Sequence, residues 1–222
     1  MTLVLNPVDS SDPLVFNGFR CIVAGYTGRD EAQVQHHIDE LAAIGVAPPP
    51  QVPMLYGMPV GAATTAERIS VPGDNSSGEV EPVLIRHRGR SYLGIGSDHT
   101  DRTVETIDIG ESKWVCPKPI GTNVVAVDDW SAFDWDACRA RSWVDGTLYQ
   151  DGPLAGLRRP DNLLAIVADR LTDLADDEDF VCFAGTLPLL NGTFVPGNQW
   201  ELELALPDGN TLRHTYRTQK GN

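Results

Sequence analysis

The chain has 222 residues, of which 31 are acidic and 17 basic, so its net charge at neutral pH is -14. This excess of negative charge repels phosphate backbones and anionic lipid, which argues against nucleic acid and membrane surfaces as partners. A chain of this length can bury one good core, and we expect a single domain spanning residues 1–222.

The sequence carries no signal for membrane insertion or export. No apolar run reaches the ~20 residues that span a bilayer, and the start of the chain lacks a basic region followed by an apolar one. We therefore expect a cytoplasmic protein. The four cysteines are scattered without a Cys-x-x-Cys pair, which predicts reduced and mostly buried thiols at Cys21, Cys116, Cys138 and Cys182.

The first part of the chain predicts a strand at residues 16–26 and a helix at residues 31–44. On that helix His37 and Glu40 lie three residues apart and hence on neighbouring positions of one face. Such a pair is usually a plain surface pair. A carboxylate beside a histidine can, however, poise it to take up a proton at neutral pH. His36 is the alternative histidine if the register shifts by one residue.

Two predicted strands in the middle of the chain carry acidic residues. Glu79 and Glu81 open an alternating segment and project from one face, because side chains two apart in a strand point the same way. A hairpin with its turn at residues 88–90 leads to a strand at residues 91–97, which ends at Asp98 level with the glutamates. Three carboxylates in one place repel and raise one another's pKa unless a cation lies among them. Oxygen ligands favour Mg²⁺, Mn²⁺ or Ca²⁺ over zinc. A Glu-x-Glu standing alone is more often one solvated face of a half-exposed sheet.

The rest of the chain predicts further strands and one amphipathic helix. The Asp145-Gly146 pair between apolar runs indicates a second hairpin. The acidic run at residues 176–179 predicts a solvated turn. Strands are expected at residues 122–127, 180–184, 200–206 and 213–217, and a helix at residues 162–174. The fold class is thus α+β and mainly β.

The order of these motifs resembles the fumarylacetoacetate hydrolase-like superfamily. That resemblance implies a mixed β-sandwich roll with a few peripheral helices, a lid-type segment at about residues 26–59, and a homodimer. The matching positions are His37 with Glu40, Glu79 with Glu81, Asp98, Lys113 in Glu-Ser-Lys, Gln150 after the Asp-Gly hairpin, Gly185-Thr186 and Pro196-Gly197.

The resemblance also implies roles for these residues. Glu79, Glu81 and Asp98 would bind Mg²⁺ or Mn²⁺, with Ca²⁺ as a further option. Catalysis would fall to His37, Glu40 and Lys113, and contacts with a small anionic substrate to Arg102, Gln150, Gly185 and Thr186. The implied reaction is hydrolysis of a carbon–carbon bond in an acylpyruvate-like 2-oxo acid through a metal-stabilised enolate. Decarboxylation, hydration or isomerisation of a small 2-oxo acid on the same site, and binding of metal or oxo acid without turnover, remain the alternatives.

Some positions depart from the superfamily pattern. The Arg-Asp that follows the metal-binding aspartate in relatives is reversed here as Asp101-Arg102, which questions the role of Arg102. Gly57 stands where relatives often carry a lysine that contacts substrate. That cationic contact is therefore absent, or comes from Arg29 or Arg68.

Overall fold

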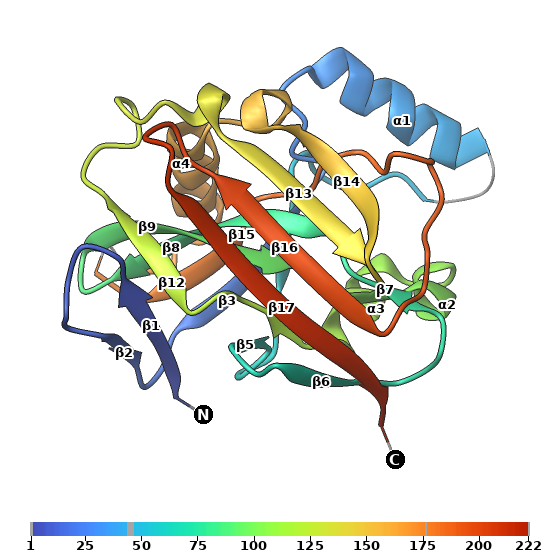
Figure 1. The fold of residues 1–222 in the computed structure, drawn as a ribbon. Coiled ribbons are helices and arrows are strands. Elements are labelled where there is room, and N and C mark those ends of the chain that lie inside the picture. The colour runs from blue at the N-terminus through green and yellow to red at the C-terminus, as the bar shows by residue number, and fades with distance from the viewer. Residues whose placement is uncertain (1, 44–46, 176, 222) are drawn as a thin grey trace.

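Two β-sheets lie face to face and form most of the molecule (Figure 1). The computed structural model describes residues 2–43, 47–175 and 177–221, and the side chains of His37, Glu40 and Leu41 lie outside the described part. Strands far outnumber helices among the described residues, which confirms the mainly β fold.

The larger sheet has eight strands and is mixed. Its spatial order is β2 (Leu14–Phe16), β1 (Leu3–Pro7), β12 (Asn123–Val127), β9 (Arg90–Ser97), β8 (Val80–His87), β15 (Phe180–Phe183), β3 (Arg20–Gly25) and β4 (Met54–Gly57). The pairs β1 with β12 and β15 with β3 are parallel, and the other neighbours are antiparallel. The N-terminal strand therefore joins the sheet beside a strand more than one hundred residues away.

The smaller sheet has five strands and lies across the larger one. Its order is β14 (Thr147–Pro153), β13 (Arg139–Val144), β16 (Gln199–Ala205), β17 (Thr211–Lys220) and β6 (Arg68–Val71). Strands β13, β16 and β17 contact β8 and β9 of the larger sheet. Two short pairs complete the set, β7 (Ser76–Ser77) with β10 (Thr100–Asp101) and β5 (Ala63–Thr64) with β11 (Lys118–Pro119).

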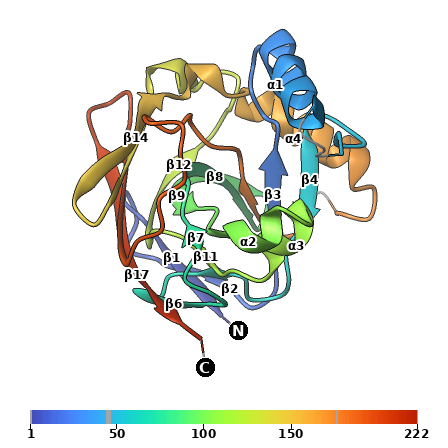
Figure 2. The same cartoon turned by 90° about the vertical axis from the view of Figure 1, so that its right-hand side faces the viewer.

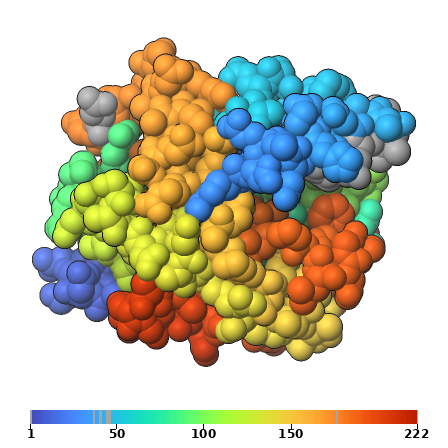
Figure 3. Space-filling model, turned by 90° about the horizontal axis from the view of Figure 1, so that it is seen from above, coloured from blue at the N-terminus to red at the C-terminus, as the bar shows by residue number. Residues whose placement is uncertain are grey.

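The helices lie at the edges of the sheets. They are α1 (Glu31–Ala43), α2 (Arg102–Glu105), α3 (Ile109–Trp114) and α4 (Pro160–Arg170), with 3₁₀ turns at Trp135–Ala137 and Leu154–Gly156. Helix α1 lies on the outer face of the molecule (Figure 3). Helices α2 and α3 pack together in front of the larger sheet and below α1 (Figure 2). The side chain of Asp30 accepts hydrogen bonds from the amides of Ala32 and Gln33, at 3.0 and 3.2 Å, and so caps α1.

The larger sheet is buried on both faces. Leu84 and Leu93 belong to the core between the two sheets, whereas Ile85 and Phe183 belong to a second core on the opposite face with Phe16. Strands covered on both sides read as continuous apolar runs instead of alternating ones. This accounts for the uninterrupted Val-Leu-Ile of β8 and Phe-Val-Cys-Phe of β15.

Both predicted hairpins are present and owe their register to their turns. The central residues Arg88 and Gly89 have φ of 49° and 74°, and Asp145 and Gly146 have φ of 47° and 79°. Two consecutive positive φ values are the mark of the type I′ turn, whose twist matches that of the flanking strands. The register then sets Val80 opposite Ser97.

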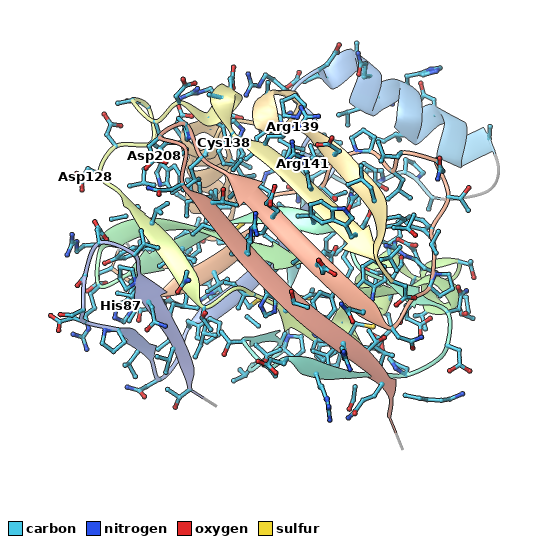
Figure 4. All side chains as sticks on the ribbon, in the orientation of Figure 1. His87, Asp128, Cys138, Arg139, Arg141 and Asp208 are labelled. Carbon is cyan, nitrogen blue, oxygen red and sulfur yellow. The ribbon has the colours of Figure 1, made fainter. Side chains whose placement is uncertain are left out.

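The acidic run at residues 176–179 is a solvated turn only in part: residue 176 lies outside the described residues, Asp177 is exposed in a turn, and Asp179 is half-buried and hydrogen-bonded. The carboxylate of Asp179 contacts Nδ1 of His87 at 2.7 Å and accepts a hydrogen bond from the amide of Arg88 at 2.8 Å. It thereby ties the start of β15 to the β8–β9 turn. His87 lies beside β1 and β2, on the side of the molecule away from α2 and α3 (Figure 4).

Two further expectations are settled by the described residues. Cys21, Cys116, Cys138 and Cys182 are all free and buried, as predicted. No helix within residues 2–43, 47–175 and 177–221 is both long and apolar enough to cross a bilayer.

We predict that Leu93→Ala lowers the free energy of unfolding by about 2–5 kcal/mol, because Leu93 is fully buried between the sheets and its loss leaves a cavity. Urea unfolding measures the effect. The matched control is Val60→Ala, whose side chain is 92% exposed and whose loss should cost less than about 0.5 kcal/mol. Equal effects of the two variants would contradict this account of the core.

Candidate active site

The β8–β9 hairpin brings three carboxylates to one end of the larger sheet. The amide of Asp98 donates to the carbonyl of Glu79 at 3.1 Å, so these two residues lie opposite each other across the strand pair. Glu81 follows two places along β8, opposite Gly96. Residues directly opposite, and residues two apart, point to the same face. The side chains of Glu79, Glu81 and Asp98 therefore project from the same face at this end of the sheet.

Asp98 is held by two lysines. The ammonium groups of Lys113, on α3, and Lys118, on β11, both contact its carboxylate, the latter at 3.1 Å. Lys118 also donates to the carbonyl of His99 at 2.6 Å. All of these side chains are buried, with Asp98 and Lys118 at 1% and 0% exposure.

The two lysines decide the charge of Asp98. Burial alone would raise the pKa of this carboxyl, but Lys113 and Lys118 outweigh it and hold the pKa well below its usual range. Burial likewise disfavours the charged form of Lys113, yet Asp98 and Glu79 raise its pKa above the ordinary value. Asp98 and Lys113 are thus both ionised at neutral pH.

Glu79 is paired with Arg102. The order Asp101-Arg102 places this arginine next to Glu79. The carboxylate of Asp101 accepts from the amides of Thr103 and Val104 and caps α2, so that Arg102 becomes the first residue of the helix. The Arg102 guanidinium donates to Ser77 at 2.7 Å through Nε, and Nη2 lies 3.2 Å from Glu79.

Glu105 and Phe194 also contact the Arg102 guanidinium. Its Nη1 donates to both carboxylate oxygens of Glu105, at 3.0 and 2.9 Å, and the ring of Phe194 covers the guanidinium at 3.5 Å. Nη2 is buried and makes no aligned hydrogen bond within the described residues. With the order Asp101-Arg102, the guanidinium thus lies beside Glu79, where Nη2 forms an ion pair without an aligned hydrogen bond.

Glu81 is the least compensated of the three carboxyls. It is 2% exposed, and among the described residues it accepts one hydrogen bond, from the amide of Gly185 at 2.9 Å. Burial and the neighbouring Asp98 raise its pKa well above the usual value, against the opposing effect of Lys113. Burial also raises the pKa of Glu79, although Arg102 counteracts it.

Gly185 can occupy this position because it is glycine. Its φ is 104°, a conformation that other residues rarely adopt, and a Cβ here would lie 1.6 Å from Oγ1 of Thr27. The tight bend at the end of β15 thus turns the Gly185 amide toward Glu81. Thr186, the next residue, donates to the carbonyl of Val80 at 3.0 Å and fixes the bend against β8.

Gln150 joins these elements from the smaller sheet. Its Oε1 accepts from the amide of Val80 at 2.8 Å and the hydroxyl of Ser142 at 2.9 Å. Its Nε2 donates to Thr186 at 2.8 Å and to the carbonyl of Leu187 at 2.7 Å. The side-chain amide thus accepts two hydrogen bonds and donates two, all within the protein. Gln150 therefore fixes the Thr186 loop over β8.

The predicted catalytic pair His37 and Glu40 falls on α1, but both side chains lie outside the described part of the structure. The alternative His36 is exposed on the same helix. Arg29 and Arg68 are the candidate substitutes for the lysine that relatives often carry at the position of Gly57. Neither side chain is free beside the three carboxylates. Arg29 binds Asp136 through both terminal nitrogens, and Arg68 is exposed on the edge strand β6.

Lys118 is the site residue that motif reasoning missed. It lies between two prolines in an otherwise apolar segment, and that setting is the signal that a buried lysine could have been expected there. Behind it, His99 contacts Tyr216 and Ser76, both at 3.0 Å. Burial lowers the pKa of His99 to about 3, so its imidazole is neutral at physiological pH. Its contacts with Tyr216 and Ser76 therefore fix the chain after Asp98 without adding charge.

The three carboxylates are the type of ligand that a hard divalent cation prefers. They project from one face, and Glu81 is a buried acid whose ionised form lacks a countercharge in direct contact. As they stand, no three or more His, Cys, Asp and Glu side chains in the described ranges are grouped closely enough to coordinate one ion. The two lysines on Asp98 would compete with an ion for that carboxylate.

A family model described as "Protein of unknown function (DUF2848)" matches residues 24–216. The chain belongs to the DUF2848 family. No curated protein sequence matches this DUF2848 protein.

Solved structures share the fold of this DUF2848 protein across its whole length. One from Oleispira antarctica, provisionally described as a fumarylacetoacetate isomerase/hydrolase, is 18% identical with a TM-score of 0.68, covering 98% of this chain and 99% of that chain. Fumarylpyruvate hydrolase from Pseudomonas aeruginosa, in complex with Mn²⁺ and pyruvate, is 15% identical with a TM-score of 0.61, covering 99% and 97%.

A third solved structure is 5-carboxymethyl-2-hydroxymuconate delta-isomerase from Mycobacterium smegmatis, 16% identical with a TM-score of 0.60, covering 100% of this chain and 94% of that chain. The DUF2848 protein therefore has the fumarylacetoacetate hydrolase-like fold that its motifs predict.

We predict that Asp98→Asn lowers the free energy of unfolding by about 3–5 kcal/mol, because it leaves Lys113 and Lys118 buried without an anion. Chemical denaturation of the purified variant measures this loss. The control is Asp74→Asn, which breaks an exposed pair with Lys220 and should cost no more than about 1 kcal/mol. A similar, small cost for both variants would show that Asp98 does not balance the lysines.

We predict that Glu81→Gln changes how stability depends on pH. The folded-state pKa of Glu81 lies above the unfolded value of about 4.3, so the native state binds the proton more tightly. Raising the pH above about 4.3 therefore removes stability from the wild type until Glu81 ionises in the native state. Glutamine keeps an acceptor for the Gly185 amide but does not titrate.

Urea unfolding in metal-free buffer, from about pH 5 to about pH 8, should show the free energy of unfolding of Glu81→Gln rising relative to wild type. A difference that stays constant across this range would mean that Glu81 has no raised pKa.

Proposed function

We propose that this DUF2848 protein is a divalent-metal-dependent enzyme that hydrolyses a carbon–carbon bond in an acylpyruvate-like 2-oxo acid. The observation that carries the proposal is the gathering of Glu79, Glu81 and Asp98 on one face of the hairpin, with the ammonium of Lys113 on Asp98. An acidic cluster with a buried lysine is suited to hold a cation and a small anion together.

Glu79, Glu81 and Asp98 would hold Mg²⁺ or Mn²⁺. The bound ion would supply Lewis-acid stabilisation of the negative charge that develops on the 2-oxo acid as its bond breaks. Glu81 supports this role most strongly, because ionising a buried carboxyl without a countercharge is unfavourable and a cation would remove that cost.

Two cations of this chain would bind the substrate carboxylate and the developing charge. The ammonium of Lys113 is buried and charged, and it can donate hydrogen bonds besides the one to Asp98. Nη2 of Arg102 is a buried donor without an aligned partner among the described residues, which supports the assignment of Arg102 to substrate binding. Burying these donors strengthens their attraction for an anion.

The loop after β15 would close the site from the opposite side. The Gly185 amide orients Glu81, and Thr186 is fixed by Gln150 and the carbonyl of Val80. These residues would act by keeping the carboxylate and the loop in one arrangement, so that little reorganisation is needed when substrate binds.

Hydrolysis also needs a base for water, and we assign this role to His37 with Glu40 on α1. A histidine next to a carboxylate can take a proton from water as the oxygen attacks the more remote carbonyl, and later return it to the departing carbon. The pair is carried over from the resemblance.

Decarboxylation, hydration or isomerisation of a 2-oxo acid remains the second candidate. It uses the same carboxylates and Lys113. Decarboxylation and isomerisation need no water-activating pair, whereas hydration does. The similarity in fold to the delta-isomerase from Mycobacterium smegmatis favours including such substrates in the screen.

Turnover tests the proposal. We predict that Mn²⁺-supplemented wild type converts at least one member of a panel of acylpyruvates, oxaloacetate and unsaturated 2-oxo acids. Lys113→Met should lower kcat/KM at least about 100-fold, as expected for a charge acting on the reacting group. Lys220→Met, which removes an exposed lysine at the end of β17, is the control and should keep wild-type activity. A wild type that turns over no panel member, or a Lys113→Met variant as active as the control, would overturn the assignment.

A further inference from the structure

A pocket lies between two turns at one end of the larger sheet. Strand β12 is parallel to β1 and antiparallel to β9, and β8 is also antiparallel to β9. Strands β1 and β8 therefore run the same way, so the β1–β2 turn and the β8–β9 turn lie at the same end. Residues of both turns line a cavity of about 440 Å³, a volume within the range of small-molecule pockets.

The pocket is far from the carboxylates of the candidate active site. Its lining includes His87, the last residue of β8, whereas Glu81 is the second residue of that strand. The extended strand places these two residues about 20 Å apart. His87 accordingly lies beside β1 and β2 in Figure 4, at the other end of the sheet from α2 and α3. A ligand bound here would therefore not contact the candidate active site.

Four charged side chains line this cavity without ion-pair partners. Arg88 and Arg90 flank the glycine of the β8–β9 turn, and Asp9 and Asp12 belong to the β1–β2 turn. All four are exposed, and none of their side chains forms a salt bridge or a hydrogen bond with another group in the described ranges. One turn thus contributes two cations to the pocket, the other contributes two acids, and the two sets are not paired with each other.

Two buried polar side chains also open into the pocket. Tyr92 is 3% exposed, and its hydroxyl has no hydrogen-bond partner among the described residues, yet its oxygen is not sealed from solvent. His87 is 6% exposed, and Asp179 contacts its Nδ1 at 2.7 Å. Because a carboxylate only accepts hydrogen bonds, Nδ1 carries the proton and Nε2 of the neutral ring is an acceptor without a partner. Both polar atoms are therefore available to a ligand in the pocket.

Most of the remaining lining is apolar. Pro7, Pro13, Leu14 and Ala126 complete the pocket together with Ser10. Binding sites for small molecules combine an apolar lining with a few polar groups that fix the orientation of the ligand. This cavity has both components.

We propose that this pocket is a second binding site, for a small zwitterion of the amino-acid class, with its carboxylate at Arg88 and Arg90 and its ammonium group at Asp9 and Asp12. The inference is independent of the proposed function.

Charge balance decides the class of ligand. A simple anion would be attracted by the arginines but would meet the uncompensated acids of the other turn, and a simple cation would meet the opposite conflict. An amino acid satisfies both turns. The Tyr92 hydroxyl can donate to its carboxylate, and Nε2 of His87 can accept from its ammonium group. The apolar lining suits an aliphatic carbon chain.

Calorimetric titration with matched probes tests the inference. Chelator-treated wild type is used, so that a metal ion at the candidate active site does not contribute. Leucine and δ-aminovalerate are zwitterions with short and long charge separation, whereas isocaproate and isoamylamine each carry only one of the two charges. We expect at least one zwitterion to bind with a dissociation constant below about 1 mM, and each single-charge probe to bind at least about tenfold more weakly than the better zwitterion.

Variants of the pocket locate the binding. Arg90→Gln and Asp12→Asn should each weaken binding of the zwitterion at least about tenfold, as for one lost charge-assisted hydrogen bond, and Tyr92→Phe should weaken it several-fold. Arg68→Gln on β6 and Asp169→Asn on α4 remove exposed charges elsewhere and should bind as wild type does. The melting temperatures of the four charge variants should stay near that of wild type, because exposed positions contribute little to stability.

Each outcome decides the matter. Loss of binding in the pocket variants alone, at unchanged melting temperature, supports the inference. Failure of both zwitterions to bind up to about 10 mM overturns it. Equally tight binding of isocaproate also overturns it, because it would indicate a site for simple anions. The same holds if Arg90→Gln and Asp12→Asn bind the zwitterion as tightly as the two controls.

Discussion

The structure depends on one buried carboxylate, that of Asp98, held between Lys113 and Lys118. Breaking a buried ion pair on one side leaves an uncompensated charge, which is far more costly than losing a surface pair. Because the three side chains come from the end of β9, from α3 and from β11, their pairing fixes these elements relative to one another. The hairpin, the short helices and the β5–β11 pair are thus joined at the same point where the candidate site lies.

Each carboxyl of the candidate site has a different compensating group. Asp98 has two ammonium groups, and Glu79 has the guanidinium of Arg102. Glu81 has the Gly185 amide and a raised pKa. A cation would gain most at Glu81, where negative charge is least balanced. The cost of burying the other charges is met by pairing, whereas Glu81 has no cation in direct contact among the described residues.

Local sequence signals sufficed for much of this arrangement. The Arg88-Gly89 and Asp145-Gly146 turns set two hairpins, and alternation put Glu79, Glu81 and Asp98 on one face. Contacts between distant segments were beyond those signals. The parallel pairing of β1 with β12 and the burial of Lys118 depend on which segments meet. The positive φ of Tyr26, 57°, likewise has no signal in the sequence, because bulky residues rarely adopt that conformation.

Mn²⁺ binding tests the central claim most directly. Chelator-treated wild type and Glu81→Gln would be titrated with Mn²⁺ by calorimetry, and their melting would be followed in parallel. The account predicts that wild type binds one ion per chain. At a hundredfold excess over the dissociation constant, the native state should gain about 2.7 kcal/mol, and the variant should lose most of both effects. If wild type binds no ion, or if Glu81→Gln binds equally well, then Glu79, Glu81 and Asp98 are not a metal site.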